Sequence, residues 1–320
     1  MNMKNESGFQ TKPRKKVKFD PRNLIILAMG ISLAVLGVKA SKLDKALTED
    51  EEYISAEASR VFEYYGEKDV INLVDPTYGD TWLAALSDVP RHEMDFDNVR
   101  LENGFKNYYI DGVKANTTGV DVSYHQGDID WEAVKADGVD FAMLRLGYRG
   151  YESGQINVDE RFHEYADGAL GAGLDIGVYF YSQAVTPEEA VEEAEVVLNE
   201  IGDYEIMYPV VFDWEIVGDE SARTNVVSAD VLNECAAAFC NRIARGGHIP
   251  MVYSVKKMAL TKFDMSRLAG FDFWLAEYRD IPEYPYYFTM WQYASDGHVN
   301  GIEGEVDLNM SLVDYSKVKR

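Results

Sequence analysis

The chain has 320 residues, of which 47% are hydrophobic and 27% are charged, and its formal net charge is −24. This apolar content excludes a chain that is disordered throughout, and the length allows one large domain with extensions or two smaller domains. The acidic balance argues against a general nucleic-acid-binding protein, because such proteins carry basic faces. Two cysteines and five histidines without an HxxxH spacing predict neither a disulfide framework nor a metal site.

The N-terminal segment differs from the rest in charge, since residues 1–39 hold eight Lys or Arg and two Asp or Glu. A basic tail, residues 1–23, precedes an uncharged apolar run from Leu24 to Val38 that ends at Lys39. This run of 15 residues lies between a signal-peptide core, roughly 7–15 residues, and a membrane-spanning helix, roughly 17–25. We expect residues 24–39 to form an N-terminal hydrophobic helix that anchors the chain in the cell membrane as a single pass, with the remainder extracytoplasmic. Secretion after cleavage near Ala40 is the alternative.

Residues 40–118 are predicted to form an acidic stalk or accessory region. Positions 41–118 hold eight Lys or Arg against 17 Asp or Glu. Apolar residues from Ala46 to Tyr65 recur with helical spacing, and several Gly and Pro residues follow with few periodic runs.

From Gly119 onward, short apolar β-rich runs alternate with helical stretches. The last three runs are separated by about eleven and twelve residues that contain Pro or Gly, too few for full packed helices. Eight strands, of which five leave room for helices, are typical of a barrel filled by its own side chains. We therefore expect residues 119–320 to form an α/β fold, a TIM-like barrel with eight strands and about five helices. The strand candidates are 119–123, 141–146, 176–181, 209–213, 250–254, 273–276, 288–292 and 305–308.

Four acids stand at or near the ends of predicted strands, where such barrels place their chemistry. They are Asp121, Asp213, Glu215 and Asp307. Asp213 and Glu215 are two residues apart on one strand, so their side chains face the same side with Cα atoms about 6.6 Å apart. Two such acids have their pKa values pushed apart, so that one donates a proton and the other stays ionised. Glycoside hydrolysis uses such a pair, because its transition state resembles an oxocarbenium ion.

Aromatic residues cluster at the same strand ends. Tyr and Trp at the mouth of a cleft give flat faces for sugar rings, although filling of the core is the alternative interpretation. The set is Tyr179, Tyr181, Tyr253, Trp274, Tyr278 and Trp291.

From Gly119 to about Val313 the chain resembles glycoside hydrolase family 25, lysozymes with N-acetylmuramidase activity. The resemblance implies a barrel that cleaves the β-1,4 bond between N-acetylmuramic acid and N-acetylglucosamine in peptidoglycan, without a cofactor. It implies that Glu215 is the general acid, that Asp213 stabilises the substrate or the charged intermediate, and that Asp121 and Asp307 are further cleft acids. It also places Arg145, Tyr179, Trp274 and Gln292 in the cleft. The matching stretches are Gly119-Val-Asp121-Val-Ser123-Tyr-His-Gln126, Ile129-Asp-Trp131, Phe141-Ala-Met-Leu-Arg145-Leu-Gly147-Tyr148, Gly173-Leu-Asp-Ile-Gly177-Val-Tyr179, Asp213-Trp-Glu215, Trp291-Gln292-Tyr293 and Val306-Asp307-Leu-Asn309.

The chain departs from the family pattern at Glu277, where an uncharged polar residue is more usual, and we expect this acid to add negative charge near the cleft. A chitinase of the related barrel type needs Asp at positions 208 and 211, where this chain has Tyr208 and Val211. The remaining alternative is a non-catalytic wall-binding or scaffolding module, against which the presence of all four acids argues. The expected partners are glycan strands of peptidoglycan and, through the N-terminal helix, a membrane, but no nucleic acid.

Overall fold

The computed structural model describes residues 70–75 and 79–318, and the chain divides into two compact units, residues 1–85 and 86–320. In the first unit, β1 (Val70–Asp75) and β2 (Gly79–Ala84) pair as an antiparallel hairpin in which Ile71 and Leu73 are buried. The predicted basic tail, the hydrophobic helix, the cleavage position near Ala40 and the helix from Ala46 to Tyr65 lie outside the described residues. In the part of the chain that is described, no helix has the length and apolarity needed to cross a membrane.

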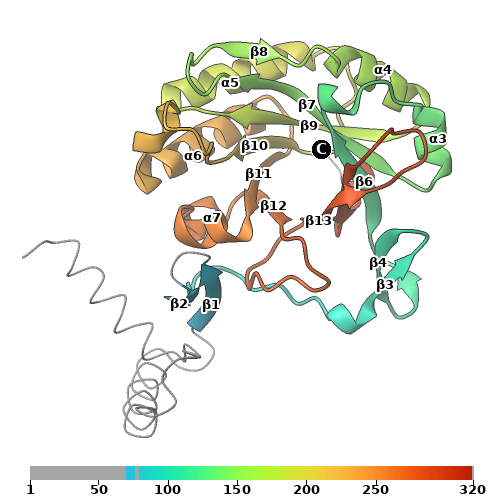
Figure 1. The fold of residues 1–320 in the computed structure, drawn as a ribbon, viewed down its shortest axis with the longest axis horizontal. Helices are drawn as coiled ribbons and strands as arrows, with labels where there is room; N and C mark the ends of the chain where they lie inside the picture. Colours follow the sequence, from blue (N-terminus) through green and yellow to red (C-terminus); the bar gives the residue numbers. More distant parts are fainter. Residues whose placement is uncertain (1–69, 76–78, 319–320) are drawn as a thin grey trace, which may run out of the picture. The chain divides into compact units, whose positions relative to one another are not determined.

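The second unit is built on a closed barrel of eight strands (Figure 1). Seven of them run parallel, and β14 pairs antiparallel with both β13 and β6 and so closes the ring. Each of the eight predicted strands overlaps one barrel strand, which confirms the predicted barrel. The strands are β6 (Thr117–Val122), β7 (Phe141–Arg149), β9 (Asp175–Ser182), β10 (Val210–Trp214), β11 (Pro250–Val255), β12 (Asp272–Ala276), β13 (Met290–Gly297) and β14 (Val306–Ser311), and the short β8 (Ile156–Val158) pairs with β7.

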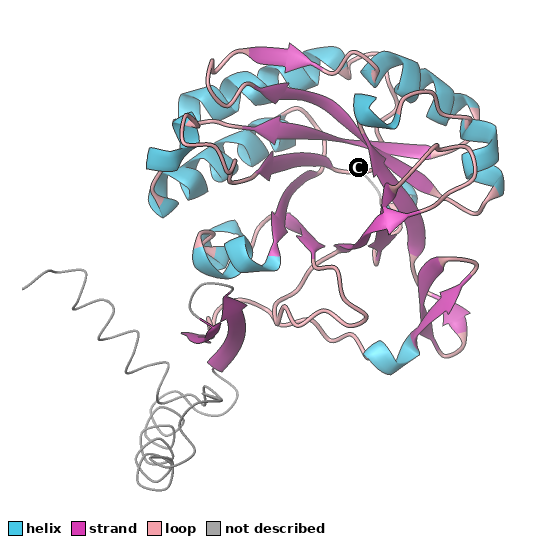
Figure 2. Ribbon diagram, viewed as in Figure 1, coloured by secondary structure: helices cyan, strands magenta, loops and turns pink. Residues whose placement is uncertain are grey.

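Six helices follow the first five barrel strands, rather than about five. The difference arises between β11 and β12, where α8 has its own N-cap in Asp264 and the connection forms two short helices. Figure 2 shows α3 to α6 along the outer face of the barrel. The helices are α3 (Trp131–Ala136), α4 (Phe162–Gly171), α5 (Pro187–Glu200), α6 (Ala229–Arg245), α7 (Lys256–Thr261) and α8 (Met265–Leu268).

Side chains from alternate strand positions fill the barrel interior. The ring of Phe141 stacks on Tyr208 with centroids 4.1 Å apart. Opposite this ring the chain has Gly119, where an added Cβ would lie 2.2 Å from Phe141. The other strand face packs on helices, as Phe212 does against Phe239 of α6. Because both faces of these strands are buried, their sequences are nearly continuous apolar runs, which is why they could be predicted.

Residues 86–118, predicted as part of a stalk, belong to the same compact unit as the barrel. They contain a three-stranded antiparallel meander of β3 (Val99–Glu102), β4 (Phe105–Ile110) and β5 (Val113–Lys114). Its turns are Asn103-Gly104 and Asp111-Gly112, and all four residues have positive φ. The segment is tied to the barrel unit by hydrogen bonds, among them one of 2.7 Å from the backbone N–H of Leu86 to the hydroxyl of Tyr286.

Candidate active site

The topology brings the four predicted acids to one end of the barrel. Asp121 lies next to the end of β6, Asp213 lies next to the end of β10, and Glu215 follows β10 directly. Asp307 is the second residue of β14. Since β14 is antiparallel to its neighbours, its beginning lies at the carboxyl ends of the parallel strands, and the register places Asp307 opposite Asp121. We call these four side chains the acid cluster.

Burial and mutual repulsion raise the pKa of every member of the acid cluster. Burial is the largest cause at each, and it raises the pKa of Asp121 to about 6 and, together with the charge of Asp121, that of Asp307 to about 8. Asp213 is only 6% exposed, and burial followed by the charge of Glu215 raises its pKa well above the usual range. The pKa of Glu215 is also raised by burial, with a smaller contribution from the charge of Asp307. Asp307, with a pKa of about 8, therefore holds a proton at neutral pH.

A network of amide and aromatic side chains fixes the carboxylate of Asp121. Its Oδ2 accepts hydrogen bonds from Nε2 of Gln292 at 2.9 Å and from Nδ2 of Asn309 at 2.7 Å. These two donors lower the pKa of Asp121 against the effect of burial. Asn309 was not predicted as a site residue, although its place two residues after Asp307 puts both side chains on one face of β14.

Tyrosine and tryptophan side chains in turn orient the two amides. Oε1 of Gln292 accepts from the hydroxyls of Tyr253 and Tyr278, each at 2.9 Å, and Oδ1 of Asn309 accepts from Nε1 of Trp274 at 2.9 Å. These bonds settle which end of each amide faces Asp121. Tyr253 and Trp274 belong to the buried core, so they orient the amides from inside the barrel. Tyr278 is 50% exposed.

Arg145 is the cation beside the acid cluster. It lowers the pKa of Asp213 against the effect of burial. Its Nε donates to Oδ2 of Asp159 at 2.8 Å, and its guanidinium lies 4.8 Å from the ring centre of Tyr124. Asp159 is buried and was not foreseen, because its position before α4 gives no local signal that it pairs with a strand residue.

Two predicted tyrosines on β9 also face the cluster. Burial raises the pKa of Tyr179 well above its usual value, and the charge of Asp121 adds to the effect. The pKa of Tyr181 is likewise raised by burial and then by the charge of Glu215. Both side chains are partly exposed, so they lie within reach of a ligand at the acids.

Trp291 and Glu277 do not present the surfaces expected of them, and Trp274 is buried as well. Trp291 was expected to offer a sugar-binding face, but it is fully buried, because successive side chains alternate along β13 and it lies on the opposite face from Gln292. Its Nε1 donates to the backbone oxygen of Glu277 at 2.9 Å. The carboxylate of Glu277 was expected to add charge near the cleft. It is instead buried, 3.2 Å from Nζ of Lys256, and accepts from the backbone N–H groups of Glu283 and Tyr284.

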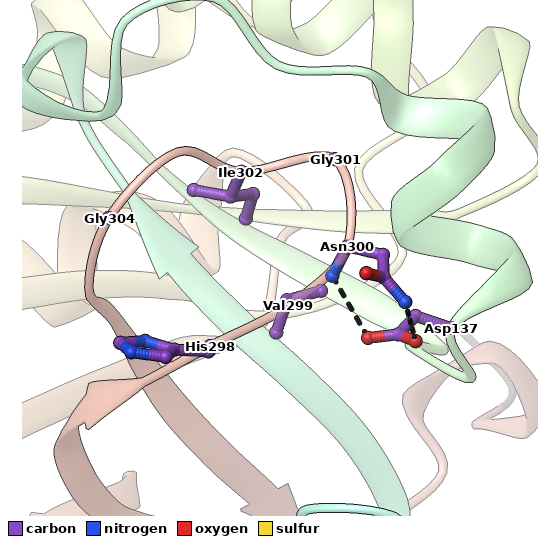
Figure 3. Close-up of a pocket in the computed structure, with 7 residues that line it drawn as sticks. All are labelled: Asp137, His298, Val299, Asn300, Gly301, Ile302 and Gly304. Atoms are coloured by element: carbon purple, nitrogen blue, oxygen red, sulfur yellow. Dashed lines mark hydrogen bonds between the residues drawn. The ribbon is translucent and has the colours of Figure 1, made fainter.

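A separate depression of about 430 Å³ lies on the loop between β13 and β14 (Figure 3). There the backbone N–H and Nδ2 of Asn300 donate to the carboxylate of Asp137 at 3.0 and 2.6 Å. None of the predicted site residues lines it, so it is not part of the candidate active site.

Known proteins resemble the part of the chain that forms the barrel. Residues 120–302 match the model of glycosyl hydrolases family 25. The chain is 28% identical over 192 residues to the autolytic lysozyme of Clostridium acetobutylicum, an alignment that covers 60% of this chain and 54% of that protein. It is 26% identical over 201 residues to lysozyme M1 of Streptomyces globisporus, covering 60% and 66% of the two chains. The chain thus spans between about half and two thirds of the length of these curated relatives.

Among solved structures, the bacterial lysozyme from Streptomyces coelicolor superposes with a TM-score of 0.50 at 25% identity, covering 60% of this chain and 90% of that one. The family match extends over more than half of the chain and includes Asp121, Asp213 and Glu215 of the acid cluster. On this evidence, the chain belongs to glycoside hydrolase family 25.

Proposed function

We propose that this protein is a muramidase that hydrolyses the β-1,4 bond between N-acetylmuramic acid and N-acetylglucosamine in peptidoglycan. The observation that carries the proposal is the acid cluster at the carboxyl ends of the barrel strands, where burial raises the pKa of Glu215. Family membership and the similarity to two lysozymes support the choice of a glycan with these sugars.

In this proposal Glu215 is the general acid. Burial raises its pKa, which favours the protonated form that the glycosidic oxygen needs as the bond to the sugar breaks. Positive charge then develops on the ring, and an ionised carboxylate nearby stabilises it. Asp121, with a pKa of about 6, is largely ionised at neutral pH, and its two amide donors hold it in place. Asp307, with a pKa of about 8, keeps its proton at neutral pH and can donate a hydrogen bond.

The test is an analysis of the reducing ends that the protein creates on purified peptidoglycan. Borohydride reduction followed by acid hydrolysis converts each new end into its sugar alcohol. We expect muramicitol. New glucosaminitol would indicate a glucosaminidase instead, and the absence of any new end would favour the non-catalytic wall-binding module. Glu215→Gln, which keeps the shape of the side chain but not its proton, is the matched control.

We further propose that the protein acts from the outer surface of the cell membrane. The basic residues 1–23 followed by the apolar run of residues 24–38 support an anchor with its N-terminus in the cytoplasm. The wall substrate would then lie on the same side of the membrane as the barrel.

A further inference from the structure

A groove of about 790 Å³ lies between the β3–β4 hairpin and the barrel. Leu101, Gly104 and Lys106 of the hairpin line one side. Tyr278, the segment 293–298 and Leu308 are among the residues that line the other. Its volume is within the range of roughly 300–1,000 Å³ that is typical of small-molecule sites.

We propose that this groove is an additional sugar-binding subsite, which holds a pyranose unit of the glycan strand outside the two sugars joined by the cleaved bond. The inference rests on the proposed muramidase function and names a further part of its substrate-binding surface. The hairpin precedes residues 120–302, the part that matches the family model, so the extension of the chain supplies one wall of this subsite and the family-matched part supplies most of the other.

Continuity with the acid cluster supports a glycan as the occupant. Tyr278 lines the groove and is half exposed. Its hydroxyl donates to Oε1 of Gln292, whose Nε2 donates to Asp121. A single side chain therefore borders the groove and is linked through one amide to a carboxylate of the cluster. A strand bound at the acids can extend along Tyr278 into the groove.

The groove has a preformed wall. Nζ of Lys106 donates to the backbone oxygens of Arg279 and Asp280 at 2.5 and 3.1 Å, and it lies 4.9 Å from the ring centre of Trp291. The backbone N–H of Lys106 donates to the hydroxyl of Tyr293 at 3.2 Å. These contacts hold the hairpin against the segment that carries Tyr278. A preformed wall costs little conformational entropy when a ligand binds.

The charges in the groove favour a neutral sugar over the carboxylates of a stem peptide. Both Lys106 and Arg279 are already engaged, the first with backbone oxygens and the second with the carboxylate of Glu283. Exposed carboxylates of Asp280 and Asp296 also line the groove and would repel an anionic group. N-acetylglucosamine, the sugar of the strand that has no lactyl carboxylate, avoids this repulsion, and its hydroxyls can bond to these acids.

The exposed side chains of the groove also match the apolar face and the hydroxyl groups of a pyranose ring. Leu101 is 71% exposed and Tyr278 is 50% exposed, so both offer apolar area to the face of a ring. Ser295, Asp296 and His298 are exposed and polar, and they can bond to ring hydroxyls. A strongly exposed leucine beside such groups has no evident packing role.

The test compares peptide-free glycan fragments of four, six and eight alternating sugars. For the wild type we expect KM to fall as the fragment lengthens enough to reach the groove. Leu101→Ala should raise KM on the long fragments by about three- to tenfold, the loss of one apolar contact, with kcat unchanged. The control is Val113→Ala, because Val113 is equally exposed (69%) on the same small sheet but does not line the groove. It should leave KM unchanged at every length.

Three outcomes would overturn the subsite. They are a wild-type KM that is independent of fragment length, a Leu101→Ala effect that is equal on short and long fragments, and a length effect that appears only when stem peptides are attached. If no fragment is cleaved, the muramidase function fails, and calorimetric titration of the same fragments and variants still measures the length dependence of binding. The experiment therefore distinguishes failure of the muramidase function from failure of the subsite.

Discussion

Glu215 is the residue on which the proposed chemistry depends most directly. Glu215→Gln should lower kcat by at least about 10²-fold, because general acid catalysis contributes roughly 10²–10⁴-fold. Binding of glycan fragments should persist, since the amide keeps the size of the carboxyl group. Turnover on purified peptidoglycan and calorimetric binding measure the two effects. A variant with an unchanged circular dichroism spectrum that retains more than about a tenth of wild-type turnover would contradict the assignment.

Gln292 contributes to the pH range in which Asp121 is ionised. The amide donors of Gln292 and Asn309 lower the pKa of Asp121, which stands at about 6. Gln292→Met removes one donor at similar volume, so the pKa of Asp121 should rise. If ionised Asp121 is required, activity appears as pH rises through this pKa, and the acid limb of the kcat/KM profile should move to higher pH.

The matched control for this shift is Tyr278→Phe. It removes a hydrogen bond to Oε1 of Gln292 but leaves the bond from Nε2 to Asp121 and the one from Tyr253. Its acid limb should stay at the wild-type position. An unmoved limb in Gln292→Met would show that the ionisation of Asp121 does not control activity.

At the scale of elements, the barrel strands could be predicted because parallel strands buried on both faces are apolar along their whole length. The β3–β5 meander was missed because its strands are short and largely exposed, as the burial of β3 shows. Its signal was nevertheless present in the dipeptides Asn103-Gly104 and Asp111-Gly112, which are typical of two-residue hairpin turns.

Part of the candidate site could be predicted from the sequence and part could not. The acids could be predicted because each stands at or near the end of an apolar run. Their arrangement depends on β14 pairing with β6, which joins Asp307 to Asp121 across 186 positions of the sequence. No local pattern specifies that register, and the bonds from Asn309 to Asp121 and from Arg145 to Asp159 depend on similar long-range contacts.

A buried ion pair joins β7 to α5 outside the site. Nε of Arg149 donates to Oε1 of Glu193 at 2.6 Å, and both side chains are buried. Burial raises the pKa of Glu193 to about 7, although Arg149 opposes the shift. Arg149→Met leaves the acid without this cation, so we expect a loss of about 3–5 kcal/mol in the free energy of unfolding at pH 8.

The loss should be smaller at pH 5. When the pKa of a carboxyl group is higher in the folded state than in the unfolded state, the free energy of unfolding falls as pH rises from the unfolded pKa to the folded pKa. At pH 5 Glu193 still holds its proton in the folded state, so the missing cation matters less. Urea denaturation at both pH values measures the difference. Arg242→Met is the control. Arg242 of α6 pairs at the surface with Glu195, which lies on α5 like Glu193, so this substitution should lower the free energy of unfolding much less at either pH. An equal loss for the two variants would contradict the buried-pair argument.

Across the whole molecule, charge is distributed unevenly. With +6 on residues 1–39, the remaining 281 residues carry −30. A basic segment that flanks an apolar run stays on the cytoplasmic side of a membrane. The acidic remainder has no such constraint, and repulsion among its charges favours solubility. The charge of residues 1–39 is therefore typical of a segment at a membrane, and the charge of the remaining residues is typical of a part that lies in water.

This distribution gives a prediction of topology. The full chain should partition with membranes and resist extraction by high salt, because an apolar segment rather than surface charge holds it. A chain that starts at Ser41 should remain in the soluble fraction and keep its activity on purified peptidoglycan, because it retains the whole unit of residues 86–320 that contains the acid cluster. Protease added outside cells whose wall has been removed should digest the acidic part of the full chain. Complete protection would place the barrel in the cytoplasm, whereas a secreted chain that begins at Ser41 would show that the segment is a cleaved signal.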